Sequence, residues 1–275
     1  MSETAPLGSV LIPAHNEAAV IRRCLDALFD GLHDGVAVAV VCNGCTDGTA
    51  ESARLSGHPV SVIEIEQASK PAALRAGEAA LPALPRLYLD ADVVLSGAAA
   101  MCLIERLSEP DALAARPPIS YRSEAASPLV RRYYRGRTGL PSVMGRVWGA
   151  GVYGLSAAGR SRFDGYPDLT AEDLFVDAHF GQDEVEIVAC DPVAVMTPRR
   201  LADLLKIMRR TYRGKNEQGR QGGGATAREL MQAAAAGRVA PLDALTYSAV
   251  AVLGRALAAR SRSDGWERDE SSRAA

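Results

Sequence analysis

The sequence lacks the features that mark several specialised classes of protein. Aromatic residues make up only 5% of its 275 residues, and its 25 glycines and 15 prolines show no excess, which excludes collagen-like and low-complexity chains. Its five cysteines form no even, regularly spaced set, so we expect no secreted disulfide framework. Because 48% of the residues are hydrophobic, an ordinary globular protein is predicted, with a core of mainly Ala, Val and Leu.

The chain also lacks a strong net charge and a recognisable targeting segment. Its formal net charge of -2 gives nucleic acid no overall attraction, although basic residues concentrate between positions 199 and 220. The opening residues MSETAPLGSVLIP contain no basic stretch followed by an apolar run, so we expect no secretory signal and a cytoplasmic location. The apolar stretch at 242–259 is interrupted by Asp243 and Arg255, and we expect it to be too short and mixed to span a bilayer.

Hydrophobic patterning predicts alternating strands and helices in the first part of the chain. Short apolar runs at 9–13, 36–42, 60–65 and 86–92 end in turn residues, and a helical stripe at 20–32 separates the first two. Val and Ile run continuously there instead of alternating with polar residues, which indicates strands covered on both faces. We therefore predict an α/β fold with a mainly parallel central sheet and helices on both faces.

Polar residues collect where the predicted strands end. The segment PAHNE at 13–17 follows the first strand, NGCTD at 43–47 the second, Lys70 the third, and Asp90-Ala91-Asp92 the fourth. Ligands of open α/β sheets bind outside the carboxyl ends of the strands, so these four loops are predicted to form one site.

Asp90 and Asp92 place two carboxylates on the same side of an extended backbone. Such hard oxygen ligands can hold Mg²⁺ or Mn²⁺ while a diphosphate fills the remaining positions. An Asp-x-Asp alone is weak evidence because solvated turn aspartates are common. Its position directly after the apolar strand RLYL makes the pattern moderately specific.

Four ordered segments resemble the motifs of the family 2 glycosyltransferases. They are VLIPAHNEAAVIRRCLDAL at 10–28, VVCNGCTDGTAE at 40–51, KPAALRAG at 70–77 and YLDADV at 88–93. The resemblance implies an inverting, hexosyltransferase-type enzyme of the glycosyltransferase A fold, with a nucleotide-sugar donor. The Gln-x-x-Arg-Trp signature of processive members is missing, which favours a non-processive enzyme.

The resemblance also implies a donor site. Its residues are Pro13, Ala14, Glu17, Asn43, Asp47, Lys70, Asp90 and Ala91. Asp90 would contact ribose or metal-bound phosphate, and Asp92 would be the more direct metal ligand. Where many members carry paired acidic residues after the second strand, this chain has Cys42-Asn43, which leaves the identity of the base open.

The segment LTAED at 169–173 resembles the acidic pair that precedes a short helix in the family's acceptor half. Asp173 is the expected catalytic base, because inverting transfer needs one carboxylate to remove the proton of the attacking hydroxyl. Thr170 or Glu172 would help to set that helix. A plainer alternative is that Glu172 and Asp173 are first-turn acids stabilised by the helix dipole.

Several other patterns have two readings. Arg209 and Arg213 lie one helical turn apart and could together face the donor phosphates, although a solvated basic face explains most such clusters. Cys42 and Cys45 form a C-x-x-C without a second pair, so we expect them to shape a turn and not to bind zinc. The glycines between 149 and 154 echo a dinucleotide fingerprint, but the residues around them are typical of a strand.

We divide the chain into a nucleotide-sugar-binding half at 1–115, an acceptor-binding and catalytic half at 116–200, and a helical C-terminal extension at 201–275. The acceptor can be a small molecule, a lipid or a glycan. For the C-terminal helices, a peripheral membrane contact and a homodimer contact stay open.

Two other functions compete with glycosyl transfer. A sugar-nucleotide nucleotidyltransferase would need a Gly-rich first loop with Arg and Lys, which PAHNEAAVIR lacks. A non-catalytic nucleotide-sugar-binding scaffold is the other alternative, against which the joint presence of Asp90, Asp92 and Asp173 argues.

Overall fold

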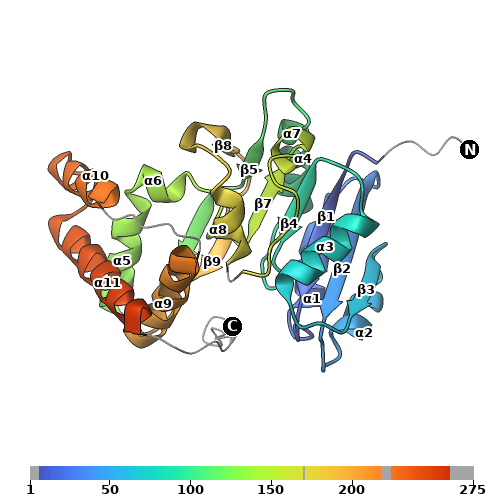
Figure 1. Cartoon of the computed structure of the whole chain (residues 1–275), viewed down its shortest axis with the longest axis horizontal. Coiled ribbons are helices and arrows are strands. Elements are labelled where there is room, and N and C mark those ends of the chain that lie inside the picture. The colour runs from blue at the N-terminus through green and yellow to red at the C-terminus, as the bar shows by residue number, and fades with distance from the viewer. Residues whose placement is uncertain (1–5, 170, 218–223, 261–275) are drawn as a thin grey trace, which may run out of the picture. The chain divides into compact units, whose positions relative to one another are not determined.

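The computed structural model describes residues 6–169, 171–217 and 224–260. Its main feature is a seven-stranded sheet (Figure 1). Its strands are β1 (Gly8–Ala14), β2 (Val36–Asn43), β3 (Ser61–Ile65), β4 (Arg86–Leu89), β5 (Ala114–Arg116), β7 (Val152–Leu155) and β8 (Val185–Ile187). They lie in the order β3-β2-β1-β4-β7-β5-β8. Neighbours are parallel except that β7 runs antiparallel to both β4 and β5. The predicted α/β fold with a mainly parallel sheet is confirmed.

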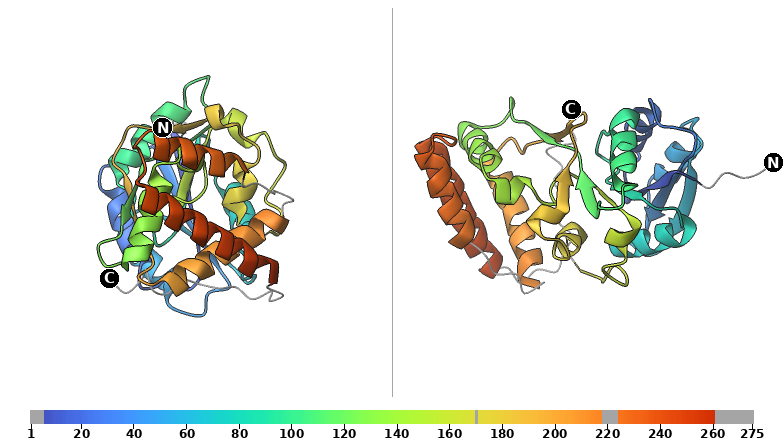
Figure 2. Two further views of the ribbon diagram at one scale, coloured as in Figure 1. Left: turned by 90° about the vertical axis from the view of Figure 1, so that its left-hand side faces the viewer. Right: turned by 90° about the horizontal axis from the view of Figure 1, so that it is seen from above.

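Helices cover both faces of this sheet. They are α1 (Ile21–Phe29), α2 (Thr49–Arg54), α3 (Lys70–Ala80) and α4 (Gly97–Leu107), followed by the short α7 (Ala157–Arg160), α8 (Glu172–Asp177) and the 3-10 turn η1 (Gln182–Glu184). Helix α1 contacts α2 and α4, whereas α3 packs on β1 and β2 from the other side (Figure 2). The approach of α3 is close, since a Cβ on Gly77 would lie 2.0 Å from Cδ1 of Leu11.

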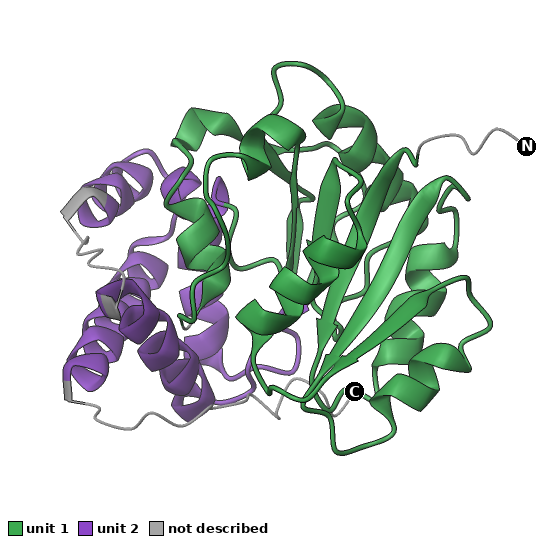
Figure 3. Ribbon diagram, turned by 45° about the vertical axis from the view of Figure 1, so that its right-hand side comes forward, with its two compact units in different colours: residues 1–120, 147–194 green, residues 121–146, 195–275 purple. Residues whose placement is uncertain are grey.

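The chain forms two compact units (Figure 3). Unit 1 comprises residues 1–120 and 147–194, and unit 2 comprises residues 121–146 and 195–275. Two of the three boundaries fall within β6 (Ile119–Arg122) and β9 (Val193–Met196), which form a separate two-stranded sheet, and the third lies between Arg146 and Val147. These boundaries differ from those of the three functional segments expected from the sequence, whose roles stay predictions.

The described part of unit 2 is built mainly from helices. They are α5 (Pro128–Thr138), α6 (Pro141–Met144), α9 (Leu201–Glu217), α10 (Gly224–Ala235) and α11 (Pro241–Arg260). Helix α11 packs on both α5 and α9. Glycines allow this packing, because a Cβ on Gly136 would lie 2.9 Å from the carbonyl oxygen of Asp243, and one on Gly254 would lie 2.8 Å from Cβ of Met208.

Helix α11 corrects one expectation from the sequence. Among the described residues, the stretch Pro241–Ala259 is 19 residues long with a mean hydropathy of 1.3, which is long and apolar enough to cross a membrane. The interruptions by Asp243 and Arg255 therefore do not make the segment too short or too mixed. Core helices of soluble proteins meet the same criteria, so this composition alone does not place α11 in a membrane.

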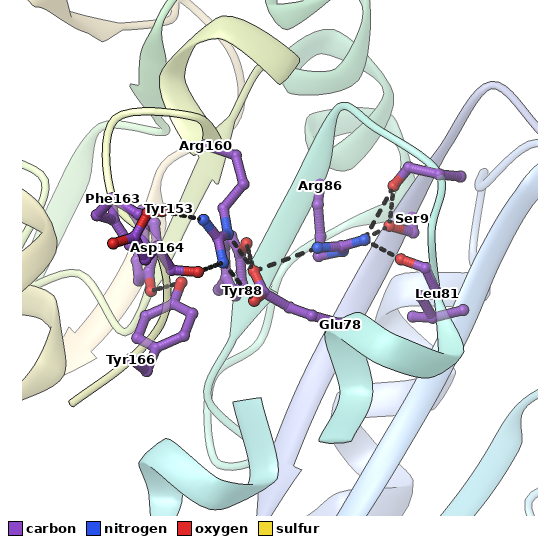
Figure 4. Close-up of polar contacts among 11 residues, drawn as sticks. Ser9, Glu78, Leu81, Arg86, Tyr88, Tyr153, Arg160, Phe163, Asp164 and Tyr166 are labelled. Atoms are coloured by element: carbon purple, nitrogen blue, oxygen red, sulfur yellow. Dashed lines mark hydrogen bonds and ion pairs between the residues drawn. The ribbon is translucent and has the colours of Figure 1, made fainter. Parts of the chain in front are cut away.

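A buried network of charged and aromatic side chains ties α3 to β4 and α7 in unit 1 (Figure 4). The Glu78 carboxylate accepts hydrogen bonds from Nε of Arg160 at 2.6 Å and from the hydroxyl of Tyr88 at 2.6 Å. It also forms an ion pair with Arg86, at 3.3 Å. Burial alone would raise the pKa of Glu78, but its hydrogen bonds with Arg160 and Tyr88 hold that pKa below its usual value.

Replacing Glu78 should destabilise the fold strongly. In Glu78→Gln the two guanidinium groups of Arg86 and Arg160 stay buried without their counter-charge, so we expect the free energy of unfolding to fall by about 3 kcal/mol. Urea-induced unfolding followed by circular dichroism measures this loss. Glu64→Gln is the matched control, because Glu64 pairs with Arg54 while its side chain is 56% exposed. It should cost much less than Glu78→Gln, because solvent screens an exposed ion pair. Equal losses in the two variants would contradict the stabilising role of the network.

Candidate active site

A pocket in unit 1 opens at the carboxyl ends of β1 and β4. Its lining comprises Pro13, Lys70, Leu74, Tyr88, Leu89, Asp90, Val147, Gly149, Gly151, Val152, Tyr153, Glu172 and Asp173. Three elements contribute the charged groups, since Lys70 begins α3, Asp90 follows β4, and Glu172 and Asp173 begin α8. Residues more than 100 positions apart therefore meet at the sheet edge where ligands of α/β proteins bind.

The Lys70 ammonium contacts acidic side chains from two different parts of the fold. Its Nζ lies 2.5 Å from Oδ1 of Asp90 and also contacts Oε1 of Glu172. The start of α3 is fixed locally, because the Ser69 side chain accepts a hydrogen bond from the backbone N–H of Ala72 at 3.3 Å. Burial alone would lower the pKa of Lys70, but the carboxylates of Asp90 and Glu172 raise it above its usual value. Lys70 is therefore a fixed cation at the centre of the pocket.

The backbone around Asp90 is held by the beginning of β7. The N–H of Asp90 donates to the carbonyl of Gly151 at 2.8 Å, and the N–H of Val93 donates to the carbonyl of Asp90 at 3.0 Å. Gly151 has φ +68, and a Cβ there would lie 2.5 Å from Cγ2 of Val93. Only glycine fits this conformation without strain, so Gly151 sets the position of the aspartate loop.

Asp173 lies in the same pocket and is partly exposed. Its Oδ1 accepts a hydrogen bond from the N–H of Leu174 at 2.8 Å, and its Oδ2 accepts one from the N–H of Gly149 at 3.3 Å. Burial and the neighbouring carboxylates of Glu172 and Asp90 raise the pKa of Asp173 to about 6, against the lowering effect of Lys70. A carboxylate with this pKa can accept a proton near neutral pH.

Ala171, directly before these two acids, adopts an unusual backbone conformation. Its φ of 60° and ψ of 69° are left-handed, a region that alanine rarely adopts. The chain therefore turns sharply into α8, so Glu172 and Asp173 both occupy its first turn. Strained residues of this kind cluster at functional sites. Thr170, expected from the sequence to help set this helix, lies outside the described residues.

The loops after β1 and β2 are connected by hydrogen bonds. Nδ2 of Asn43 donates to the carbonyl of Ala14 at 2.8 Å, and the Asn43 carbonyl lies 2.5 Å from Nδ1 of His15. The Asn43 side chain is almost fully buried, so it holds the backbone of the first loop. Cys45 completes the connection, since its Sγ lies 3.5 Å from the carbonyl of Ala14 and 3.4 Å from the N–H of Asn16. The expected turn-shaping role fits these contacts.

Asp47 and Glu17 belong to the same connection. The Asp47 carboxylate accepts hydrogen bonds from the N–H groups of Thr49 at 3.1 Å and Ala18 at 3.2 Å. Burial alone would raise the pKa of Asp47, but these hydrogen bonds and that of the Thr49 hydroxyl hold it below its usual value. The N–H of Glu17 donates to Oγ1 of Thr49 at 2.8 Å. The Asp47 side chain and the Glu17 backbone therefore stabilise the rim of the predicted donor site.

Asp92 lies two residues after Asp90 and is not among the residues that line the pocket. Ala91 between them is buried, whereas Asp92 is partly exposed. Burial raises the pKa of the Cys24 thiol on α1 to about 12, and the charges of Asp92 and Asp90 add to this effect. Within the described ranges, no three His, Cys, Asp or Glu side chains converge as a metal site. The protein could therefore supply one or two carboxylates here, a donor set that suits Mg²⁺ or Mn²⁺ when phosphate oxygens complete the shell.

The two predicted phosphate-binding arginines belong to another part of the fold. Arg209 and Arg213 lie on α9 in unit 2, whereas every residue that lines the pocket belongs to unit 1. Their role in donor binding stays a prediction.

Two features of the pocket were not evident from the sequence. The ion pair between Lys70 and Glu172 joins positions that no periodicity connects. Tyr88 and Tyr153 stack with ring centroids 4.8 Å apart and line the pocket, although each belongs to an ordinary apolar strand. The left-handed backbone of Gly149, with φ +91, did have a signal in the sequence, because a cluster of glycines precedes β7. The expectation that these glycines do not form a dinucleotide fingerprint is consistent with the strand that follows them.

Comparison with known proteins identifies the family of these motifs. The sequence model of the family described as "Glycosyl transferase family 2" matches residues 9–158, which is more than half of the chain. Over 67 residues the chain is 40% identical to "Glycosyltransferase AglE" of Haloferax volcanii. That match covers 24% of this chain and 22% of the relative, so the chain matches only about a fifth of that protein's length.

Solved structures share the fold. A mannosyltransferase of Pyrobaculum calidifontis, solved with GDP-Man and Mn²⁺, superimposes with a TM-score of 0.67 at 18% identity, over 95% of this chain and 89% of that one. Glucosyl-3-phosphoglycerate synthase of Mycobacterium tuberculosis, solved with Mn²⁺, UDP and glucosyl-3-phosphoglycerate, gives a TM-score of 0.52 at 22% identity, over 78% and 81% of the two chains. At these identities the likeness establishes the glycosyltransferase A type of fold.

Removing the central cation should make Asp173 harder to ionise. In Lys70→Met the carboxylates of Asp90 and Glu172 remain beside Asp173 without a compensating charge, so its pKa should rise further above about 6. Carbon-13 NMR titration of the aspartate carboxyl groups measures this change. Lys206→Met is the control, because the Lys206 side chain is 62% exposed and pairs with Asp203. An unchanged Asp173 titration in a folded Lys70→Met protein would contradict the arrangement.

Proposed function

We propose that this chain, which belongs to glycosyl transferase family 2, is a metal-dependent, inverting and non-processive glycosyltransferase. It would move a sugar of hexose type from a nucleoside diphosphate to a hydroxyl group of a small molecule, a lipid or a glycan. One observation carries the proposal most directly. Lys70 contacts both Asp90 of the predicted donor site and Glu172, which directly precedes the predicted base Asp173.

The donor would lie along the carboxyl ends of the first four strands. Pro13 and Ala14 offer backbone at the end of β1, and Lys70 and Asp90 offer charged groups in the pocket. Asn43, Asp47 and Glu17 would act mainly by holding the surrounding loops, given their hydrogen bonds with backbone and with Thr49. We propose Arg209 and Arg213 as additional phosphate contacts, on the strength of their helical spacing alone.

The residues present fit a divalent cation. Asp92 is taken as the more direct ligand, as the family resemblance implies, and Asp90 also contacts Lys70 through Oδ1. Mg²⁺ or Mn²⁺ bound there would neutralise charge on the departing diphosphate. Structures of the mannosyltransferase and the synthase described above contain Mn²⁺, which supports the same choice here. The positive charge of Lys70 would further stabilise the developing negative charge.

Asp173 would act on the acceptor. Its carboxylate would take the proton of the acceptor hydroxyl as that oxygen forms a bond to the anomeric carbon. The bond between this carbon and the diphosphate oxygen would break on the opposite side, so the configuration at the anomeric carbon would invert. The hydrogen bonds from the backbone of Gly149 and Leu174 would keep the carboxylate in place during the transfer.

The alternatives explain less of the pocket. A scaffold that only binds nucleotide-sugars has no need of a carboxylate whose pKa is raised to about 6 beside the donor site. A nucleotidyltransferase would need the basic, Gly-rich first loop that this chain lacks. The cytoplasmic location expected from the sequence stays a prediction.

Asp173→Asn should separate donor binding from transfer. The amide cannot accept the hydroxyl proton, so turnover should fall by roughly 10²- to 10⁴-fold while donor affinity changes little. Nucleoside diphosphate release with a panel of acceptors measures turnover, and calorimetry measures donor binding. In the wild type, turnover should rise with pH through about 6, because only the deprotonated carboxylate is a base. A variant with normal turnover would show that Asp173 is not the base.

Asp92→Asn should weaken donor binding in the presence of metal. A thermal-shift panel with GDP-mannose and UDP-glucose, with and without Mn²⁺, tests this, since a ligand at a hundred times its Kd adds about 2.7 kcal/mol of stability. The wild type should show a Mn²⁺-dependent shift with at least one donor, and the variant should lose most of it. Asp34→Asn, at an exposed position before β2, is the control. Donor-induced shifts that do not depend on metal would contradict the metal proposal.

A further inference from the structure

Helix α11 has an outward face of unusual composition. Among residues 241–259 of this helix, for which the exposure is described, nine are exposed; none of the nine is charged, and Ser248 is the only polar one among them. The largest are Leu242, Leu245, Val252 and Leu253, which are 51%, 66%, 63% and 44% exposed. A helix that covers a soluble protein normally presents charged and polar residues to water. The outward face of α11 instead has the composition of a surface that is covered by another protein or by lipid.

The charge of unit 2 indicates which kind of partner covers this face. Counted over the full sequence, unit 2 contains 21 of the 31 Lys and Arg residues but 9 of the 33 Asp and Glu residues, a formal net charge of +12. Unit 1 correspondingly carries -14, so the overall charge of -2 conceals a strong separation. A cationic unit with an exposed apolar helix is complementary to a bilayer that contains anionic lipids.

Basic side chains lie directly beside this helix. Helix α5, which packs on α11, contains four arginines and no acidic residue. Arg135 and Arg132 form ion pairs with Asp243 in the first turn of α11, at 2.7 and 3.5 Å, and the Arg135 side chain is 57% exposed. Next to them on the same helix, Leu129 is 48% exposed. Exposed apolar groups and cationic groups therefore both occur where α5 meets the first turn of α11, a combination that suits a lipid–water interface.

We propose that the outward face of α11, with the adjoining arginines of α5, docks unit 2 on the surface of an anionic phospholipid bilayer. The opposite face of α11 packs through Tyr247, Val250 and Gly254 inside unit 2. The helix therefore lies along the membrane surface and does not cross it. The sequence left open whether a membrane or a second copy of the chain covers this face. The membrane is favoured, because two copies of unit 2, each with a formal net charge of +12, would repel each other in a symmetric contact. The proposal does not depend on the proposed transferase activity.

Vesicle binding by the full chain tests the proposal. Sedimentation with vesicles of phosphatidylcholine alone, or of phosphatidylcholine and phosphatidylglycerol in equal parts, compares neutral with anionic surfaces. The wild type should bind the anionic vesicles more tightly, and high salt should weaken this binding. The double variant Leu245→Glu/Val252→Glu removes two outward apolar groups without touching the packed face. It should bind anionic vesicles about tenfold or more weakly.

Leu55→Glu is the matched control, because Leu55 in unit 1 is 66% exposed and lies outside this face. It should bind vesicles as the wild type does, and circular dichroism should show that all variants are folded. Failure of the wild type to bind anionic vesicles, or equal binding to neutral ones, would overturn the proposal. A dimer in light scattering that the double variant dissociates, without vesicle binding, would assign the face to a second copy instead. Donor binding measured on the same samples tests the transferase proposal separately.

Discussion

The contacts of one ammonium group with two carboxylates organise the pocket. Lys70 lies between Asp90, which follows β4, and Glu172, which begins α8, and these positions are 20 and 102 residues away in sequence. Without this cation, three carboxylates would lie together in a partly buried space, at a high electrostatic cost. The same cation lowers the pKa of Asp173, which burial and its acidic neighbours raise. Lys70 therefore allows the acids that follow β4 and those that begin α8 to share one site.

The position of Lys70 depends in turn on the packing of α3. Glu78, two turns further along this helix, is held by Arg160 of α7 and by Tyr88 of β4. Tyr88 lies two residues before Asp90 and stacks on Tyr153 of β7. Helix α3 is thus fixed at both ends to the strands that present the pocket. The charged groups of the pocket are therefore positioned by a second, more deeply buried set of charged and aromatic side chains around Glu78.

Much of this could be predicted from the sequence, for physical reasons. Continuous Val and Ile runs specify parallel strands, and parallel strands bring their carboxyl ends to one edge, so the convergence of Pro13, Lys70 and Asp90 followed from local patterns. The antiparallel insertion of β7 between β4 and β5 could not be predicted, because strand order depends on long-range packing. For the same reason the sequence could not predict the Lys70–Glu172 ion pair. Nor could it predict that the buried Asn43 side chain holds the backbone of the first loop. Nor did composition show that one face of α11 is exposed.

The way the chain is divided between its units has an evolutionary consequence. All residues that line the pocket come from the segments 1–120 and 147–194, and the chain leaves unit 1 after Ser120 and returns to it at Val147. Substitutions within 121–146, or after Ala194, therefore change no group of the pocket wall. The pocket wall by itself therefore places no constraint on the sequence of unit 2. Related chains with nearly identical pockets could then differ widely in this unit, and in whatever surface it recognises.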